Sequence, residues 1–272
     1  MNMAKYTFGF IGSGNMGGAI ACAAAKSFQK NEIAVSDKCE EKANALAEKL
    51  GCVACDSRTV AKSAKYIFLG VKPQVMSAAL SEISDVLAER EDRFILVTMA
   101  AGIPIAAFNE MLSAKYPIIR IMPNTPVGVG KGMILFCTCP VITDSEVEEF
   151  CTALQFAGKL DRIDEKLIDA ASAVSGCGPA FVYMFAEAMA DAGVECGLPR
   201  DKALLYASQT LSGAAELLLT SNKHPGTLKD EVCSPGGSTI AGVHTLESNG
   251  FRGSVISAVK ASFDRTKELG SK

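Results

Sequence analysis

The sequence predicts an α/β fold in its first part and an all-helical second part. Short apolar runs alternate with amphipathic segments as far as Arg162, and this alternation is typical of a parallel sheet covered by helices. From Asp164 onward no strand-like run appears, and Ala-rich and Leu-rich segments take over. We therefore predict an α/β domain over residues 1–162 and a helical domain over residues 163–272.

The α/β assignment depends on apolar runs with the length and composition of buried strands. These runs are Tyr6–Ile11, Glu32–Val35, Gly51–Ala54, Tyr66–Val71, Phe94–Met99 and Ile118–Met122. Between them, Glu40–Leu50 and Gln74–Ala88 carry apolar residues on one face, as crossover helices do. Gly132–Cys137 is expected to add an edge strand. Thr143 and Glu146 form a capping-box pattern, which predicts a helix running to about Ala157.

Composition narrows the class of function. The 272 residues include 27 basic and 30 acidic side chains, for a net charge of -3, without a long run of either sign. A nucleic-acid footprint or a patch for anionic membranes is therefore not expected, and the expected partner is a small molecule. The N-terminus lacks the pattern of a secretion signal, and no segment approaches the roughly 18 unbroken apolar residues of a spanning helix. We expect a soluble, cytoplasmic protein.

The ten cysteines do not predict a metal site. The close pairs are Cys52 with Cys55 and Cys137 with Cys139, and the two histidines of the chain lie far from both. A structural zinc site needs a second pair or histidines at matching intervals. We expect reduced cysteines that pack as small apolar residues, and no metal.

A glycine-rich turn follows the first predicted strand and opens a helix. Its sequence is Gly12-Ser13-Gly14-Asn15-Met16-Gly17. In this setting Gly12 allows a tight turn, Gly14 lets a pyrophosphate approach the backbone, and Gly17 lets helix and strand pack closely. The unsatisfied N–H groups at the helix start can then bind phosphate. The turn predicts a Rossmann-like, doubly wound domain that binds a dinucleotide.

An acidic residue stands where the ribose contact is expected, about 20 positions further on. Asp37 ends the second predicted strand and points toward NADH. A carboxylate facing the 2′-phosphate of NADPH at about 4 Å would cost about 1 kcal/mol in water and about 4 kcal/mol at an effective dielectric constant of 20. However, Ser36 and Lys38 beside it can satisfy that phosphate. The sequence thus leaves NADPH and NADH both open.

Five further motifs accompany the glycine turn. They are Gly70-Val-Lys-Pro73, Met99-Ala-Ala-Gly102, Arg120-Ile-Met-Pro-Asn-Thr-Pro126, Val174-Ser-Gly-Cys-Gly-Pro-Ala-Phe181 and Ser234-Pro-Gly-Gly-Ser-Thr239. With the turn, and in this order over almost the whole chain, they resemble pyrroline-5-carboxylate reductases, which reduce the cyclic imine 1-pyrroline-5-carboxylate to L-proline with NAD(P)H in proline biosynthesis. The resemblance also implies a homodimer formed through the helical domain, and allows larger rings.

The resemblance assigns cofactor contacts beyond the glycine turn. Ser57 is implied near the adenosine ribose. The backbones of two strand-end segments are implied against the nicotinamide half, at the sheet edge where α/β proteins bind ligands. These residues are Val71, Lys72, Pro73, Met99, Ala100 and Ala101.

The Ser234–Thr239 loop is the predicted substrate site. Gly236 and Gly237 free its backbone to form a concavity of N–H groups, which suits a carboxylate, although a simple β-turn with a helix cap explains the same residues. The resemblance implies that Ser238 and Thr239 contact the substrate and that the Thr239 hydroxyl hydrogen-bonds the ring nitrogen.

Three other positions are less directly matched. The resemblance implies that Glu165 is a neighbouring substrate contact. Glu231 and Cys177 stand where the family usually has Asn and Ser, so their roles stay open. No base accompanies Cys177 in its segment, which favours a packing role.

Ala180–Val194 is apolar nearly all round. Such a helix needs cover on several faces, which favours a dimer over the central helix of a monomeric bundle.

Rival functions are a reductase of another cyclic imine or of a β-hydroxy acid, and a catalytically silent dinucleotide sensor. The β-hydroxy acid enzymes with this two-domain plan generally have a catalytic Lys in the helical domain. Lys202 stands instead at an exposed helix start, which disfavours that alternative. The intact Ser234–Thr239 loop disfavours a sensor.

Overall fold

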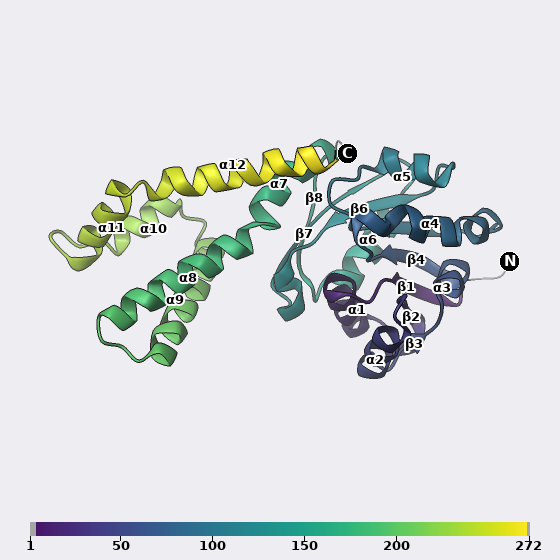
Figure 1. The fold of residues 1–272 in the computed structure, drawn as a ribbon, viewed down its shortest axis with the longest axis horizontal. Coiled ribbons are helices and arrows are strands. Elements are labelled where there is room, and N and C mark those ends of the chain that lie inside the picture. The colour runs from purple at the N-terminus through teal and green to yellow at the C-terminus, as the bar shows by residue number, and fades with distance from the viewer. Residues whose placement is uncertain (1–3, 271–272) are drawn as a thin grey trace. The chain divides into compact units, whose positions relative to one another are not determined.

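The computed structural model describes residues 4–270, and the chain divides into two compact units (Figure 1). The first unit extends to Gly176 and takes up the chain again from Phe263, while the second is Cys177–Ser262. The sequence-based domain boundary after Arg162 stays a prediction.

The first unit is built on one eight-stranded sheet with the order β3-β2-β1-β4-β5-β6-β7-β8. The strands are β1 (Tyr6–Ile11), β2 (Ile33–Ser36), β3 (Val53–Ala54), β4 (Ala64–Leu69), β5 (Ile95–Thr98), β6 (Ile118–Met122), β7 (Gly132–Thr138) and β8 (Gly158–Arg162). From β1 the chain builds the sheet outward to β3, then returns to place β4 on the other side of β1. The strand order therefore reverses between β1 and β4, and a crevice opens at such a switch point.

Helices cover both faces of this sheet, as the doubly wound class requires. They are α1 (Asn15–Ser27), α2 (Glu40–Leu50), α3 (Ser57–Ser63), α4 (Pro73–Ala88), α5 (Ile105–Leu112), α6 (Asp144–Leu154) and α7 (Ile168–Ser175). One apolar core packs α3, α4, α5 and α7 against the sheet, with Met76 and Phe108 fully buried. A separate core packs α1, α2 and α6, with Ile20 and Phe150 fully buried. The predicted fold class is confirmed.

The sheet differs from the prediction at one end. The strand at Gly132–Cys137 exists, but β7 runs antiparallel to β6 and is not the edge. Only a short connection with one 3-10 turn (η2, Thr125–Val129) joins the two strands, and a parallel pairing needs a crossover of a dozen residues or more. The edge strand is β8, which sequence reasoning missed because its residues are polar and largely exposed.

The helix predicted from Thr143 begins as expected. The Thr143 hydroxyl accepts from the Glu146 N–H, and the Glu146 carboxylate accepts from the Thr143 N–H at 2.8 Å, which completes the capping box. This helix, α6, ends at Leu154, short of Ala157. The chain must turn there into β8, and Gly158 supplies the left-handed φ of +138°.

The second unit contains helices and their connections, with no strand among residues 177–262, as predicted. Its helices are α8 (Gly178–Glu195), α9 (Arg200–Ser221), α10 (Pro225–Glu231), α11 (Ser238–Ser248) and the start of α12 (Phe251–Gly270). A small core of Ala190, Ala203 and Ala207 packs α8 against α9. Small side chains at this contact let the two helices approach closely.

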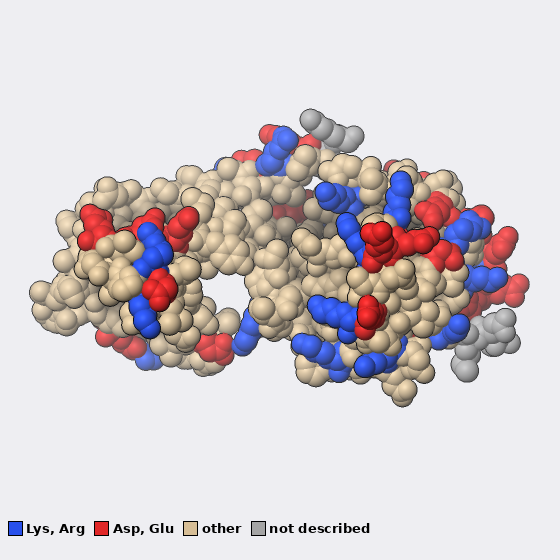
Figure 2. Space-filling view, turned by 60° about the horizontal axis from the view of Figure 1, so that its bottom comes forward, with Lys and Arg blue, Asp and Glu red and all other residues tan. Residues whose placement is uncertain are grey.

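Large apolar side chains on the second unit are exposed. Met184 on α8, Leu219 on α9 and Ile256 on α12 have exposed fractions of 68%, 72% and 68%. Wide areas of the surface in Figure 2 carry no charged side chain. By length and composition alone, Glu165–Glu195 is the one described helical stretch apolar enough to cross a membrane. Exposed apolar side chains gathered on one unit mark a surface that interacts with another protein or a membrane.

Candidate nucleotide and substrate site

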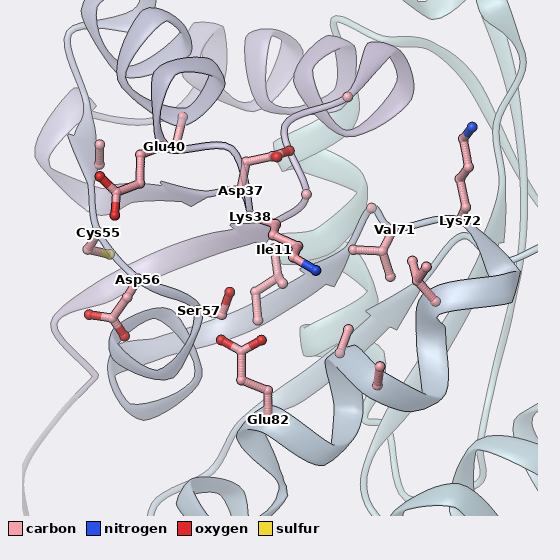
Figure 3. Close-up of a pocket in the computed structure, with 18 of the residues that line it drawn as sticks. Ile11, Asp37, Lys38, Glu40, Cys55, Asp56, Ser57, Val71, Lys72 and Glu82 are labelled. Carbon is pink, nitrogen blue, oxygen red and sulfur yellow. The ribbon is translucent and has the colours of Figure 1, made fainter.

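A pocket of about 890 Å³ lies at the carboxyl ends of the strands, at the switch point (Figure 3). It belongs entirely to the first unit. Of the predicted cofactor residues, the structure brings together around it Gly12, Gly14, Asp37, Lys38, Ser57, Val71 and Lys72.

The glycine turn forms one wall of this pocket. Gly12 has a φ of +103°, and a Cβ atom on Gly17 would overlap the Gly12 carbonyl oxygen. These two glycines are therefore required by backbone conformation and packing. A Cβ atom on Gly14, in contrast, would meet no heavy atom within 4 Å. The smallness of Gly14 keeps open a space beside the backbone, where a ligand can approach.

The start of α1 is free to bind an anion. Its N-cap, Gly14, has no side chain to cap the helix, and the first turn contains no acidic residue. The first N–H groups of a helix lack intrahelical partners, and with the helix dipole they favour a phosphate. Together with the space at Gly14, this arrangement fits the pyrophosphate of NAD(P)H.

Asp37 is held in a fixed position at the end of β2. Its Oδ2 accepts from the Ser13 N–H at 2.7 Å, and its Oδ1 accepts from the Cys39 N–H at 3.0 Å. The half-buried carboxylate thus ties the glycine turn to the loop after β2 and still lines the pocket. An Asp in this position can bind the ribose of a dinucleotide.

Ser36 lies behind the pocket wall. It is 1% exposed, and its hydroxyl lies 3.3 Å from the Phe10 carbonyl and 3.4 Å from the Ser57 hydroxyl. These bonds support β2 and the start of α3. Ser13 also stays outside the pocket lining, and its hydroxyl donates to the Ser36 carbonyl at 3.1 Å. Both serines are placed to support the nucleotide site from behind.

The remaining predicted cofactor residues lie at neighbouring strand and helix ends, outside the lining of this pocket. Asn15, Met16 and Gly17 form the first turn of α1, and Pro73 starts α4. Met99, Ala100 and Ala101 directly follow β5, which pairs in parallel with β4. The carboxyl ends of parallel strands meet at one edge of the sheet, so these segments lie at the same edge as Val71, and their contact with the cofactor stays a prediction.

Three acidic residues line the pocket that sequence reasoning did not single out: Glu40, Asp56 and Glu82. Asp56 caps α3, and hydrogen bonds from the Thr59 hydroxyl and N–H lower the pKa of its carboxyl. Helical spacing could have indicated Glu82. On α4, Val75, Ala78, Ala79 and Glu82 recur along one face, and all of them line the pocket.

Glu165 takes part in a network around a buried arginine. Arg120 on β6 is 2% exposed and donates to Glu165 at 3.3 Å and to Asp169 at 3.1 Å. The same Glu165 oxygen accepts from the Ile105 N–H at 2.7 Å, at the start of α5. The carboxylate therefore links β6 and α5 within the first unit, and its predicted contact with substrate stays a prediction.

The predicted substrate loop belongs to the second unit, whereas Glu165 belongs to the first. Gly236 has a φ of +68°, and Gly237 is the N-cap of α11 without a side-chain cap. Ser238 and Thr239 are exposed in the first turn, which contains no acidic residue. The start of α11 thus presents free N–H groups beside two hydroxyls, an arrangement that can bind a carboxylate.

Glu231 and Cys177, whose roles stay open, lie at the ends of helices. Glu231 ends α10 and pairs with Lys223 at 2.6 Å. Cys177 precedes α8 as its N-cap and is half-buried.

Among the other cysteines, burial raises the pKa of Cys137 to about 11. Over residues 4–270, no group of three or more His, Cys, Asp or Glu could hold a metal ion.

The doubly wound sheet and the open glycine turn at its switch point define a dinucleotide-binding protein of the Rossmann class. In agreement, residues 7–102 match the family model described as "NADP oxidoreductase coenzyme F420-dependent". Residues 165–269 match the model described as "Pyrroline-5-carboxylate reductase dimerisation". The chain is therefore similar to oxidoreductases in its first unit and to one family of them in its helical region.

Similarity over the full length identifies that family. A pyrroline-5-carboxylate reductase of Pisum sativum is 39% identical over 97% of this chain and 96% of its own length. That of Escherichia coli K12 is 39% identical over 96% and 97%. A crystal structure of Plasmodium falciparum pyrroline carboxylate reductase with NADP bound aligns with a TM-score of 0.87 and 30% identity, covering 99% of this chain and 100% of that one. The chain belongs to the pyrroline-5-carboxylate reductase family, which confirms the resemblance.

Proposed function

We propose that this protein reduces 1-pyrroline-5-carboxylate to L-proline with NAD(P)H, the final step of proline biosynthesis. The observation that carries the proposal is the extent of its similarity to named reductases, 97% of the chain for the Pisum sativum enzyme. This span includes both the glycine turn of the first unit and the Ser234–Thr239 loop of the second.

The first unit binds and orients the nucleotide in this proposal. When bound, the cofactor would supply a hydride to the carbon of the imine, whose nitrogen is protonated from solvent and keeps that proton in the product amine. The glycine turn and the start of α1 hold the pyrophosphate, Asp37 holds a ribose, and the backbones of Val71–Pro73 and Met99–Ala101 flank the nicotinamide. Catalysis rests mainly on this positioning, because hydride transfer requires no protein nucleophile.

The start of α11 binds the substrate. Its free N–H groups receive the carboxylate of the imine, with contacts from Gly236, Gly237 and Ser238. The Thr239 hydroxyl hydrogen-bonds the ring nitrogen and stabilises it as its charge changes during reduction. Glu165 is a further substrate contact in this proposal.

We further propose a homodimer that covers the apolar helices of the second unit. The exposed side chains of Met184, Leu219 and Ile256 give the area that a second copy would bury. The dimerisation family model over residues 165–269 supports this assignment. Larger rings of dimers, a cytoplasmic location, and the absence of membrane or nucleic-acid partners belong to the same proposal.

A turnover assay with several substrates tests the function. The purified protein is mixed with NADH or NADPH and 1-pyrroline-5-carboxylate, absorbance at the nicotinamide band is followed, and proline is quantified. We expect one proline per nucleotide oxidised, and no nucleotide reduction with β-hydroxy acids and NAD(P). Reduction of nucleotide by a β-hydroxy acid, preference for a different cyclic imine, or nucleotide binding without any turnover would overturn the proposal.

A further inference from the structure

The geometry points to a nucleotide pocket that selects NADH over NADPH, with Asp37 as the residue that determines this specificity. The inference rests on the proposed nucleotide site and goes beyond it, because that proposal leaves the choice of nucleotide open. It follows from the position of Asp37 and from the other charges in the pocket. It also follows from the group at the 2′ position of the adenosine ribose, which is a hydroxyl in NADH and a phosphate in NADPH.

Asp37 can accept hydrogen bonds from a ribose that has free hydroxyls. Each carboxylate oxygen receives one backbone N–H, from Ser13 at 2.7 Å and from Cys39 at 3.0 Å. A carboxylate oxygen can accept more than one hydrogen bond, so each retains capacity for a hydroxyl donor. Because the backbone fixes the group on the pocket wall, it cannot rotate away from a ligand without losing both bonds.

The 2′-phosphate of NADPH is a poor match for this carboxylate. It replaces a hydroxyl donor by a group with about two negative charges at neutral pH, whose oxygens are chiefly acceptors. The phosphate oxygens and the Asp37 carboxylate oxygens would then face each other, although both accept hydrogen bonds and both are negatively charged. The arrangement that binds the ribose hydroxyls of NADH therefore repels the phosphate of NADPH.

The other charged residues of the pocket increase this selectivity. Glu40, Asp56 and Glu82 line it together with Asp37, against the two lysines Lys38 and Lys72. Figure 3 shows Glu82 and Lys38 extending into the pocket, while Lys72 extends away from the other labelled side chains. The described lining contains no arginine, the side chain best suited to bind a phosphate through two hydrogen bonds. Lys38 is thus the one lining cation that Figure 3 shows extending into the pocket, against four acidic lining residues.

Binding of each nucleotide, measured without imine, tests the inference directly. Nicotinamide fluorescence is titrated with the full-length protein to obtain Kd for NADH and NADPH. We expect the Kd for NADH to be lower by about tenfold or more, the ratio that corresponds to roughly 1.4 kcal/mol. An equal Kd, or tighter binding of NADPH through Lys38, would overturn the inference, whatever the behaviour of any variant.

Asp37→Asn locates the specificity in one side chain. Asn keeps the shape and one oxygen acceptor but removes the charge, so the Kd ratio should move toward NADPH by about tenfold. Glu41→Gln is the matched control, because it removes a charge from the same segment at a residue outside the pocket lining, and its ratio should change by less than about twofold. A folded Asp37→Asn with an unchanged ratio contradicts the assignment.

The same measurements separate this inference from the proposed function. A protein that binds NADH selectively but does not reduce the imine refutes the function alone. A protein that reduces the imine but binds NADPH at least as tightly refutes the selectivity alone.

Discussion

Gly14 and Gly17 belong to one turn but are small for different reasons. The side-chain position of Gly17 is filled by the Gly12 carbonyl, whereas that of Gly14 is open space on the pocket wall. Both glycines could be predicted from sequence, because the strand before them and the helix after them define the motif. Their separate contributions to packing and to ligand binding become visible only in three dimensions.

Alanine at each glycine should separate these contributions. Gly17→Ala overlaps backbone and should lower the free energy of unfolding by about 1–3 kcal/mol, as overpacking does. Gly14→Ala should leave stability within about 0.5 kcal/mol of the parent, because no neighbour obstructs the new methyl group. It should nevertheless weaken NADH binding by about tenfold, since the methyl occupies space beside the pyrophosphate. Denaturant titration measures the stability of both variants, and nucleotide titration measures their Kd for NADH. A destabilised Gly14→Ala would contradict the assignment of Gly14 to ligand binding.

Thr239 permits a test of the proposed substrate contact. Thr239→Val removes the hydroxyl at nearly constant shape and should lower kcat with the imine by about tenfold to a hundredfold, the loss expected for one hydrogen bond to a charged group. Nucleotide Kd should stay unchanged, and Thr239→Ser should restore most of the rate. Thr245→Val is the control, because the Thr245 hydroxyl already donates to the Ala241 carbonyl within α11. Equal turnover by Thr239→Val and the parent would remove Thr239 from the mechanism.

Not every residue near the pocket could be foreseen. Asp37 follows from its spacing after the glycine turn, but the approach of Glu82 depends on how α4 packs on the sheet. The network of Arg120 with Glu165 and Asp169 joins segments far apart in the chain. Such contacts are set by tertiary packing, which a single sequence does not reveal.

Among the elements, α6 has an electrostatic anchor at its first turn. Arg93 donates to both oxygens of Glu146, at 2.8 and 3.0 Å, and Glu146 also accepts from the Thr143 N–H. The hydrogen bonds from Arg93, followed by those at Thr143, lower the pKa of Glu146 to about 2 from a usual value of 4.5. The side chain of Glu146 is 11% exposed and that of Arg93 is 45% exposed, so solvent screens the pair in part.

This anchor predicts a pH dependence of stability. A carboxyl with a lowered pKa in the folded state stabilises it above the unfolded pKa, and this contribution is lost as the pH falls from about 4.5 to about 2. Glu146→Gln should lower the free energy of unfolding at pH 7 by about 2–3 kcal/mol and flatten its change over that range. Asp144→Asn, in the same turn with a side chain 97% exposed, should change it by less than about 0.5 kcal/mol. Unfolding titrations at several pH values decide; an unchanged acid limb in Glu146→Gln would contradict the assignment.

Strands show where sequence patterns stop being informative. The bounds of β1 and β6 match the prediction because continuous apolar runs define buried strands. The direction of β7 depends on the length of a connection, and β8 has almost no apolar signal. The short helices α3 and α5 were also not predicted, since few turns give little periodicity.

At the scale of the whole molecule, the apolar helices of the second unit are the dominant feature. The apolar character of Ala180–Val194 was apparent in sequence, and in the structure Ala190 is the one fully buried residue of α8 among those described. The proposed homodimer would cover these helices with a second copy of the same surface.

A charge on α8 should break this assembly. Met184 has an exposed fraction of 68%, so Met184→Asp should be tolerated by the fold of one copy but not by an apolar interface. We expect light scattering after size-exclusion chromatography to give a dimer or larger species for the parent and a monomer for Met184→Asp. Val141→Asp, at a residue 59% exposed in the first unit, should keep the parent's assembly. A monomeric parent would contradict the proposed dimer.

Transfer of deuterium from the nicotinamide to proline is the decisive test of the proposed reduction. The protein is incubated with 1-pyrroline-5-carboxylate and NADH deuterated at the transferring position of C4, and the product is analysed by mass spectrometry and NMR. We expect L-proline with one deuterium on the ring carbon that was the imine carbon, which is the carbon bonded to nitrogen on the side away from the carboxylate-bearing carbon. Proline without deuterium, deuterium at another position, or labelled nucleotide oxidised without proline would contradict it.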